Sequence, residues 1–93
     1  MNIIQKIKNG EVDEVDLLEY ITDNDIDVAI AAAESEIATE PILDIASRDK
    51  DRRVRKAVVC NKNIGVRTLK YLVKDNDVEI AALARERLME DEI

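Results

Sequence analysis

The stretch DKDRRVRKAVV, residues 49–59, has a counterpart 26 residues earlier, DNDIDVAIAAA (23–33), and another 26 residues later, DNDVEIAALAR (75–85). Each copy contains Asp-x-Asp, and the position five residues after the first Asp is apolar, as are those three and four residues further on. The spacing i, i+3, i+4 marks one face of a short helix. The sequence therefore predicts a helical repeat.

The other half of each unit carries a second apolar stripe at the same period. It consists of Leu17, Leu43 and Leu69, followed three positions later by Tyr20, Ala46 and Leu72. Asp13, Thr39 and Gly65, types favoured at helix N-caps, precede it. Pro41 falls in the first turn, where its missing N–H costs nothing. We therefore expect two short helices in each unit.

The links between helices carry their own signals. We expect Asp25, Asp51 and Asp77 to cap the helices that follow them. Asn24 and Asn76 suit a left-handed residue that ends the preceding helix, and Lys50 at the equivalent place predicts a different link there. The pair Asn9-Gly10 predicts the end of a first helix.

The expected fold is all-α: a short right-handed α-solenoid of about seven helices, or three and a half helical hairpins, in one domain over residues 1–93. The predicted helices are 2–9, 14–22, 26–35, 40–48, 52–61, 66–74 and 78–90, in units of about 1–22, 23–48, 49–74 and 75–93. The composition agrees, because two Gly, one Pro and no Phe or Trp disfavour a β-sandwich.

DKDRRVRKAVVCNKN (49–63), followed by VRTLKYLVKD (66–75), resembles the variant leucine-rich repeat. LVKDNDVEIAALARERL (72–88) resembles a HEAT repeat of the armadillo-like superfamily. The likeness covers roughly residues 12–89 and implies a curved α-solenoid that binds proteins, or less often nucleic acid, on one row of helices. In this pattern an Arg often follows the Val, and it is present only as Arg55.

The residue types argue against catalysis and against a cofactor. The chain has one cysteine, Cys60, and no histidine, so it lacks the ligands of a zinc or iron–sulfur site and the usual base for a cysteine nucleophile. We expect Cys60 to be inert and partly exposed. Asp23, Asp25, Asp27 and Glu34 have calcium-loop spacing, but Val28 replaces the required glycine, so we interpret these carboxylates as helix caps.

The charge is distributed very unevenly. Residues 48–74 contain ten basic and two acidic residues, a net charge of +8, within a chain whose net charge is -7. This excess predicts a contact surface for an anionic group, with the candidate residues Arg52, Arg53, Arg55, Lys56, Arg67 and Lys70. The alternative interpretation is that these charges only decorate solvated faces and attract neighbouring units modestly.

We therefore expect a non-catalytic protein-interaction module whose partner is another protein with an acidic patch. Two alternatives stay open: an anion or nucleic-acid binder that uses the helix at 52–61, and a small acidic inhibitor or self-associating unit. Nucleic acid is less favoured, because acidic segments flank the basic one. No stretch approaches a membrane span or a signal peptide, so we expect a cytoplasmic protein without a membrane partner.

Overall fold

The computed structural model describes residues 2–91, and within this range the chain forms seven α-helices and no strand. The helices are α1 (Ile3–Lys8), α2 (Glu14–Tyr20), α3 (Ile26–Glu34), α4 (Glu40–Ala46), α5 (Arg52–Cys60), α6 (Val66–Leu72) and α7 (Val78–Asp91). The all-α prediction is confirmed. Six of the seven helices begin at the predicted residue, because their N-cap residues can be recognised in the sequence. Residues 1, 92 and 93, at the ends of the outer predicted units, lie outside the described range.

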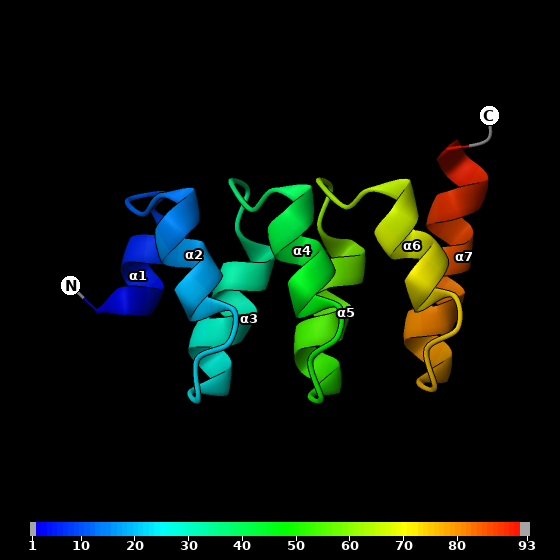
Figure 1. Ribbon diagram of the computed structural model, residues 1–93, viewed down its shortest axis with the longest axis horizontal. Coiled ribbons are helices and arrows are strands. Elements are labelled where there is room, and N and C mark those ends of the chain that lie inside the picture. The colour runs from blue at the N-terminus through cyan, green and yellow to red at the C-terminus, as the bar shows by residue number, and fades with distance from the viewer. Residues whose placement is uncertain (1, 92–93) are drawn as a thin grey trace.

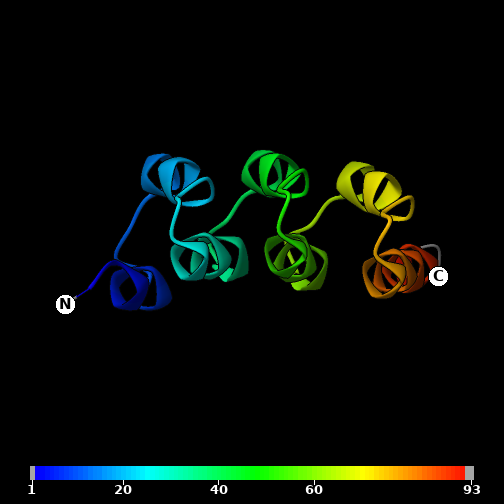
Figure 2. The same ribbon diagram turned by 90° about the horizontal axis from the view of Figure 1, so that it is seen from below.

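The helices lie in two rows (Figures 1 and 2). One row contains α1, α3, α5 and α7, and the other contains α2, α4 and α6. Helices pack against their neighbours within the row, and α2 to α7 also pack against helices of the other row, so that α3, for example, contacts α1, α5, α2 and α4. The longest extent, 40 Å, therefore runs along the rows.

Both aspartates of the Asp-x-Asp motif accept backbone hydrogen bonds at the start of α3, α5 and α7. Its first carboxylate accepts a hydrogen bond from the backbone N–H of the second Asp, at 2.8 Å in Asp23, Asp49 and Asp75 alike. The second carboxylate caps the helix, since Asp25 accepts from Asp27 N, Asp51 from Arg53 N and Asp77 from Ile80 N. The predicted capping role of these aspartates is confirmed.

Two predictions about the links were wrong. No non-glycine residue in the described range has a positive φ, so neither Asn24 nor Asn76 is left-handed. The helices before these links end instead in right-handed caps, Ile21, Ser47 and Val73, and a further turn bond follows each cap. Because this turn needs no left-handed residue, the link at Lys50 adopts the same conformation as the other two.

The predicted stop at Asn9-Gly10 is confirmed. Gly10 has a φ of 70°, and the N–H groups of Gly10 and Glu11 bond back to the carbonyls of Ile7 and Lys6. This is the Schellman arrangement, in which a glycine takes the left-handed position at the lowest cost. It turns the chain from α1 towards the other row.

The core lies between the two rows and contains the predicted stripes. Val28, Val54 and Ile80 are buried, as are Leu17, Leu43 and Leu69. Alanines fill much of α3, where Ala29, Ala31, Ala32 and Ala33 are all buried and allow neighbouring helices to approach closely. Such small side chains let each unit bury its stripe against the next.

A ladder of polar side chains, which the sequence analysis did not predict, joins successive units. Asn61 donates from its side-chain nitrogen to the carbonyls of Ala33 and Ser35, both at 2.9 Å. One unit later, Arg87 donates to the carbonyls of Val59 and Asn61, both at 3.1 Å. The two donors are 26 residues apart, and so are the corresponding acceptors. An Asn and an Arg side chain therefore make equivalent contacts at equivalent positions of the repeat.

We predict that Asn61→Ala lowers the free energy of unfolding by about 2 kcal/mol, because two buried carbonyls lose their donor. Asn63→Ala is the matched control: Asn63 bonds the carbonyls of Glu36 and Ala38 in the same way but is exposed, so water replaces it and the loss stays below about 1 kcal/mol. Urea unfolding followed by circular dichroism measures both. Equal losses in the two variants would contradict the role of the ladder.

Candidate functional site

The predicted basic site begins on α5, whose apolar stripe fixes the direction of its charges. Val54, Val58 and Val59 are buried, so the remaining positions carry the basic side chains away from the core. Arg52 and Arg53 are exposed, whereas Arg55 and Lys56 are partly buried. Each of these four cations contacts at least one carboxylate of the chain itself.

Arg55 is the most deeply placed of the four. Its Nε and Nη2 atoms donate to the two carboxylate oxygens of Asp75, at 2.8 and 3.2 Å. Its Nη1 atom donates to the carbonyls of Asp49 and Lys50, at 2.9 and 3.0 Å. The side chains of Arg55 and Asp75 are only 12% and 6% exposed. One guanidinium therefore connects the α4–α5 link with the α6–α7 link.

Arg52 and Lys56 are bound by the start of α7. Arg52 donates to Asp77 and Glu79, at 2.5 and 2.7 Å, and the Lys56 ammonium lies 3.2 Å from the other oxygen of Glu79. The hydrogen bond from Arg52 lowers the pKa of Asp77 to about 2, with help from the backbone N–H of Ile80. Lys56, and then Arg52, lower the pKa of Glu79. The two carboxylates in turn raise the pKa of Arg52.

Arg53 completes the set within its own helix. Its Nε and Nη2 atoms donate to the two oxygens of its N-cap residue Asp51, at 3.0 and 2.8 Å. This side-chain contact, followed by the Arg53 backbone N–H, lowers the pKa of Asp51 to about 2. The four cations of α5 are thus matched by Asp51, Asp75, Asp77 and Glu79, which removes the local charge excess that the sequence suggested.

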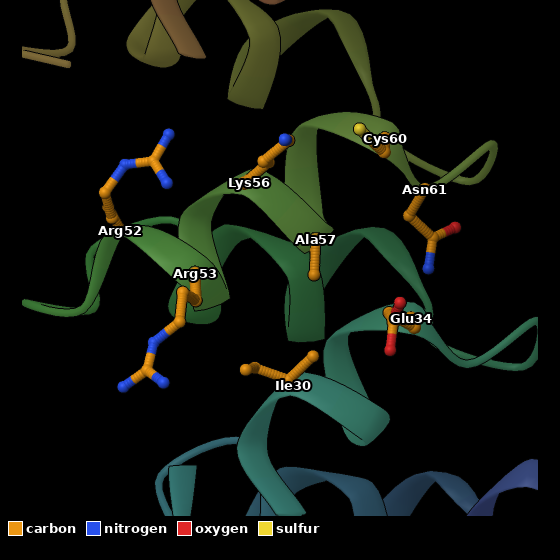
Figure 3. Close-up of a pocket in the computed structure, with 8 residues that line it drawn as sticks. All are labelled: Ile30, Glu34, Arg52, Arg53, Lys56, Ala57, Cys60 and Asn61. Atoms are coloured by element: carbon orange, nitrogen blue, oxygen red, sulfur yellow. The ribbon is translucent and has the colours of Figure 1, made fainter. Parts of the chain in front are cut away.

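A surface pocket of about 480 Å³ lies between α3 and α5 (Figure 3). Its lining residues are Ile30, Glu34, Arg52, Arg53, Lys56, Ala57, Cys60 and Asn61. Figure 3 shows Ala57 pointing towards Ile30, whereas Arg52 and Lys56 point to the opposite side of α5. Because these two cations face α7, Ile30 and Ala57 face each other in the pocket, with Glu34, Arg53 and Asn61 beside them. Cys60 is exposed, as predicted.

The remaining predicted residues, Arg67 and Lys70, lie on α6 in the other row, so the six candidates do not form one surface. Both are exposed, as is Lys74 just beyond the helix. Among the described residues, none of these three cations lies within 4.0 Å of a carboxylate oxygen. Among the six candidate residues, the cations without a carboxylate partner therefore lie on α6 rather than on α5.

Exposed apolar side chains surround these α6 cations. Tyr71 on α6 and Ile45 on α4 are 43% and 46% exposed, and the Arg48 guanidinium stacks over the Tyr71 ring at 4.2 Å. Two surface pockets lie beside these residues. The first, of about 330 Å³, is lined by Glu40, Pro41, Asp44, Ile45 and Arg67. The second, of about 390 Å³, lies where α4 and α6 end and is lined by Ser47, Arg48, Arg55, Tyr71, Lys74, Asp75 and Asn76. We call this surface the α4–α6 face and define it by Pro41, Ile45, Arg48, Arg67, Lys70, Tyr71 and Lys74.

Sequence reasoning missed the apolar members of the α4–α6 face and Lys74. The signal that could have found them is the 26-residue register itself. Glu19, Ile45 and Tyr71 occupy equivalent positions, two places after the core leucine of each unit. An apolar residue where one copy has Glu indicates a surface position, and both Ile45 and Tyr71 are exposed.

The remaining expectations concern ligands. The calcium-like spacing at Asp23–Glu34 is occupied by helix caps and by the continuous helix α3, as expected. Within residues 2–91, no three His, Cys, Asp or Glu side chains are grouped in a way that could hold a metal ion. No helix in the same range has the length and apolar character needed to cross a membrane.

A comparison with protein-family models, with curated proteins and with solved structures finds no match for this chain.

We predict that Arg55→Met lowers the free energy of unfolding by about 3 kcal/mol, because the nearly buried Asp75 carboxylate then lacks its cation. Arg53→Met is the control on the same helix: its ion pair is exposed, so the loss stays within about 1 kcal/mol. Denaturant unfolding of the two variants beside the unmodified chain measures the difference. If Arg55→Met costs no more than Arg53→Met, the structural role of Arg55 is wrong.

The lowered pKa values of Asp51 and Asp77 predict acid sensitivity. Both are about 2 in the folded chain against 3.8 ordinarily, so their stabilising effect is complete above pH 4 and is lost as the pH falls towards 2. Arg52→Gln removes the main cause of the lowered pKa of Asp77. The free energy of unfolding of this variant should therefore fall less between pH 5 and pH 2 than that of the unmodified chain. Urea midpoints at both pH values provide the measurement, and an unchanged pH dependence would count against the pairing.

Proposed function

We propose that this chain is a short right-handed α-solenoid of the HEAT-like or variant leucine-rich, armadillo-like type, and that it acts as a non-catalytic protein-interaction module. Three features support the architecture: the 26-residue repeat, the two rows of short helices, and the side-chain ladder that recurs at the repeat period. Stacked helical units of this kind present long side-chain surfaces suited to binding other proteins.

The contact surface that we propose is the α4–α6 face. The observation that carries this choice is the set of exposed cations without a carboxylate partner, Arg67, Lys70 and Lys74, beside exposed Tyr71 and Ile45. Residues that dominate protein interfaces are enriched in Tyr and Arg and lie in pockets from which a partner excludes water. The two pockets beside Ile45 and Tyr71 offer such places.

The α5 cations are less suited to the same task. An anionic partner at Arg52 or Lys56 competes with Glu79, and one at Arg55 competes with the nearly buried Asp75. Breaking such a pair leaves a carboxylate without its cation, which costs several kcal/mol when the group is buried. The α6 cations carry no such cost, so the partner gains the full interaction there.

The partner that fits is an acidic protein segment that also carries apolar side chains. Its carboxylates would pair with Arg67, Lys70 and Lys74, while its apolar groups enter the pockets beside Ile45 and Tyr71. A nucleic acid is a poorer match, because the chain has a net charge of -7 and acidic segments flank the basic one in the sequence.

Affinity capture from lysate, quantified by mass spectrometry, tests this proposal. We predict that Arg67→Glu with Lys70→Glu loses proteins that the unmodified chain captures, because repulsion replaces attraction. Lys8→Glu with Arg85→Glu makes the same charge change on exposed positions of α1 and α7, and should retain them. The proposal fails if all three baits capture the same proteins or if the unmodified chain captures none. Loss of capture after nuclease treatment would instead support the nucleic-acid alternative.

A further inference from the structure

The row that carries the α4–α6 face has oppositely charged ends. Residues 11–22, which include α2, contain Glu11, Asp13, Glu14, Asp16 and Glu19 and no basic residue. Residues 65–74, which include α6, contain three basic residues and no acidic one. Figures 1 and 2 place α2 and α6 at opposite ends of this row, with α4 between them.

The acidic end has the properties that the proposed partner needs. None of its carboxylates lies within 4.0 Å of a Lys or Arg nitrogen of residues 2–90. Glu14 accepts a hydrogen bond from the Thr39 hydroxyl, and Asp13 and Asp16 form the N-terminal cap of α2. Two apolar side chains stand among them, Val15 and Leu18, which are 68% and 41% exposed. Acidic groups and apolar side chains therefore occur together on α2, as the α4–α6 face requires.

Residues of α2, α4 and α6 occupy equivalent positions of the repeat. Val15, Pro41 and Arg67 are equivalent in the 26-residue register, and so are Glu19, Ile45 and Tyr71. Along the row, the exposed residues change from acidic and apolar on α2, through Glu40, Pro41 and Ile45 on α4, to basic and aromatic on α6. A second copy turned by a two-fold rotation about an axis parallel to α4 would place α2 over the partner's α6, and α4 over the partner's α4.

We propose that the partner of this face is a second copy of the chain, bound as a closed two-fold dimer through the α2, α4 and α6 row. This inference rests on the proposed function, because it names the occupant of the same surface. A self-complementary surface forms two identical contacts in a closed pair, whereas a head-to-tail contact leaves one end of each chain open. Each pairing of α2 with α6 brings together at least two carboxylates and three cations.

The size of the surface is sufficient for a dimer. The broad side of the molecule measures 40 by 25 Å, and Figure 1 looks onto the row of α2, α4 and α6 on that side. A stable pair needs about 800 Å² of accessible surface from each partner, so the dimer that we propose would cover most of this side. Ile45, near the two-fold axis, would meet its own counterpart and exclude water at the centre.

Sedimentation velocity over a range of concentrations tests the dimer with an exchange of charges. We expect Arg67→Glu with Lys70→Glu, and separately Glu14→Lys with Glu19→Lys, to weaken dimerisation at least about tenfold, because like charges then face each other. A mixture of the two variants should restore it, since the mixed pair has opposite charges at both contacts. This exchange is sharper than added salt, because two chains of net charge -7 also repel each other overall.

Two further variants keep the test decisive. Ile45→Asp should also weaken the dimer at least about tenfold, and Lys8→Glu with Arg85→Glu should leave it unchanged. Circular dichroism and urea unfolding establish that each variant is folded, and the mixing result does not depend on any one variant alone. A chain that stays monomeric up to about 0.5 mM, an open series of larger assemblies, or variants that do not recover on mixing would each overturn the inference.

The two proposals fail in different ways. If the chain is monomeric but Arg67→Glu with Lys70→Glu still loses captured proteins, the interaction module stands and only the self-partner is wrong. If the dimer forms and neither these charges nor Ile45 affects it, the dimer contact lies elsewhere and the self-partner inference is wrong, whereas the capture experiment still decides the interaction module.

Discussion

The rest of the C-terminal half depends on the contact between Arg55 and Asp75. The guanidinium bonds both oxygens of Asp75 and also two backbone carbonyls of the preceding link, so that one side chain spans two units. Asp75 is at the same time the residue that turns the backbone into α7, through its bond from Asp77 N. Because the pair is nearly buried, it tolerates the loss of neither partner. The position of α7, and with it the environment of Asp77 and Glu79, follows from this junction.

The positive charges of α5 and α6 fall into two classes. On α5, Arg52, Arg55 and Lys56 join units together through Asp75, Asp77 and Glu79, whereas Arg53 bonds the N-cap residue of its own helix. Those on α6 project from the other row and meet no carboxylate among the described residues. A surface pair adds at most about 1 kcal/mol to stability, so exposed cations such as Lys70 are free to serve recognition instead. The same sequence segment, residues 48–74, therefore contains both the cations that hold units together and the surface that we propose for a partner.

Much of the fold was predictable because it depends on local signals. Periodic aspartates, apolar residues at i, i+3 and i+4, and Asn9-Gly10 act over a few residues, and the register repeats them. The site was less predictable, because a sequence does not say which charges meet. Arg52 and Glu79 are 27 residues apart, and only stacking of the units brings them together. The hydrogen bonds of Asn61 and Arg87 were not predicted for a related reason. The two donors differ in residue type, and their acceptors are backbone carbonyls, which every residue possesses.

The central claim is that the arginines of α5 and α6 have different tasks, and arginine labelling tests it most directly. A dicarbonyl reagent applied to the native chain, with each site quantified by mass spectrometry, should modify Arg67 rapidly in dilute solution and Arg55 slowly. Arg67 should become protected as the concentration rises and the face is covered, whereas the slow rate of Arg55 should not change. The account would be contradicted if the two residues react at equal rates in dilute solution, or if Arg67 gains no protection at any concentration.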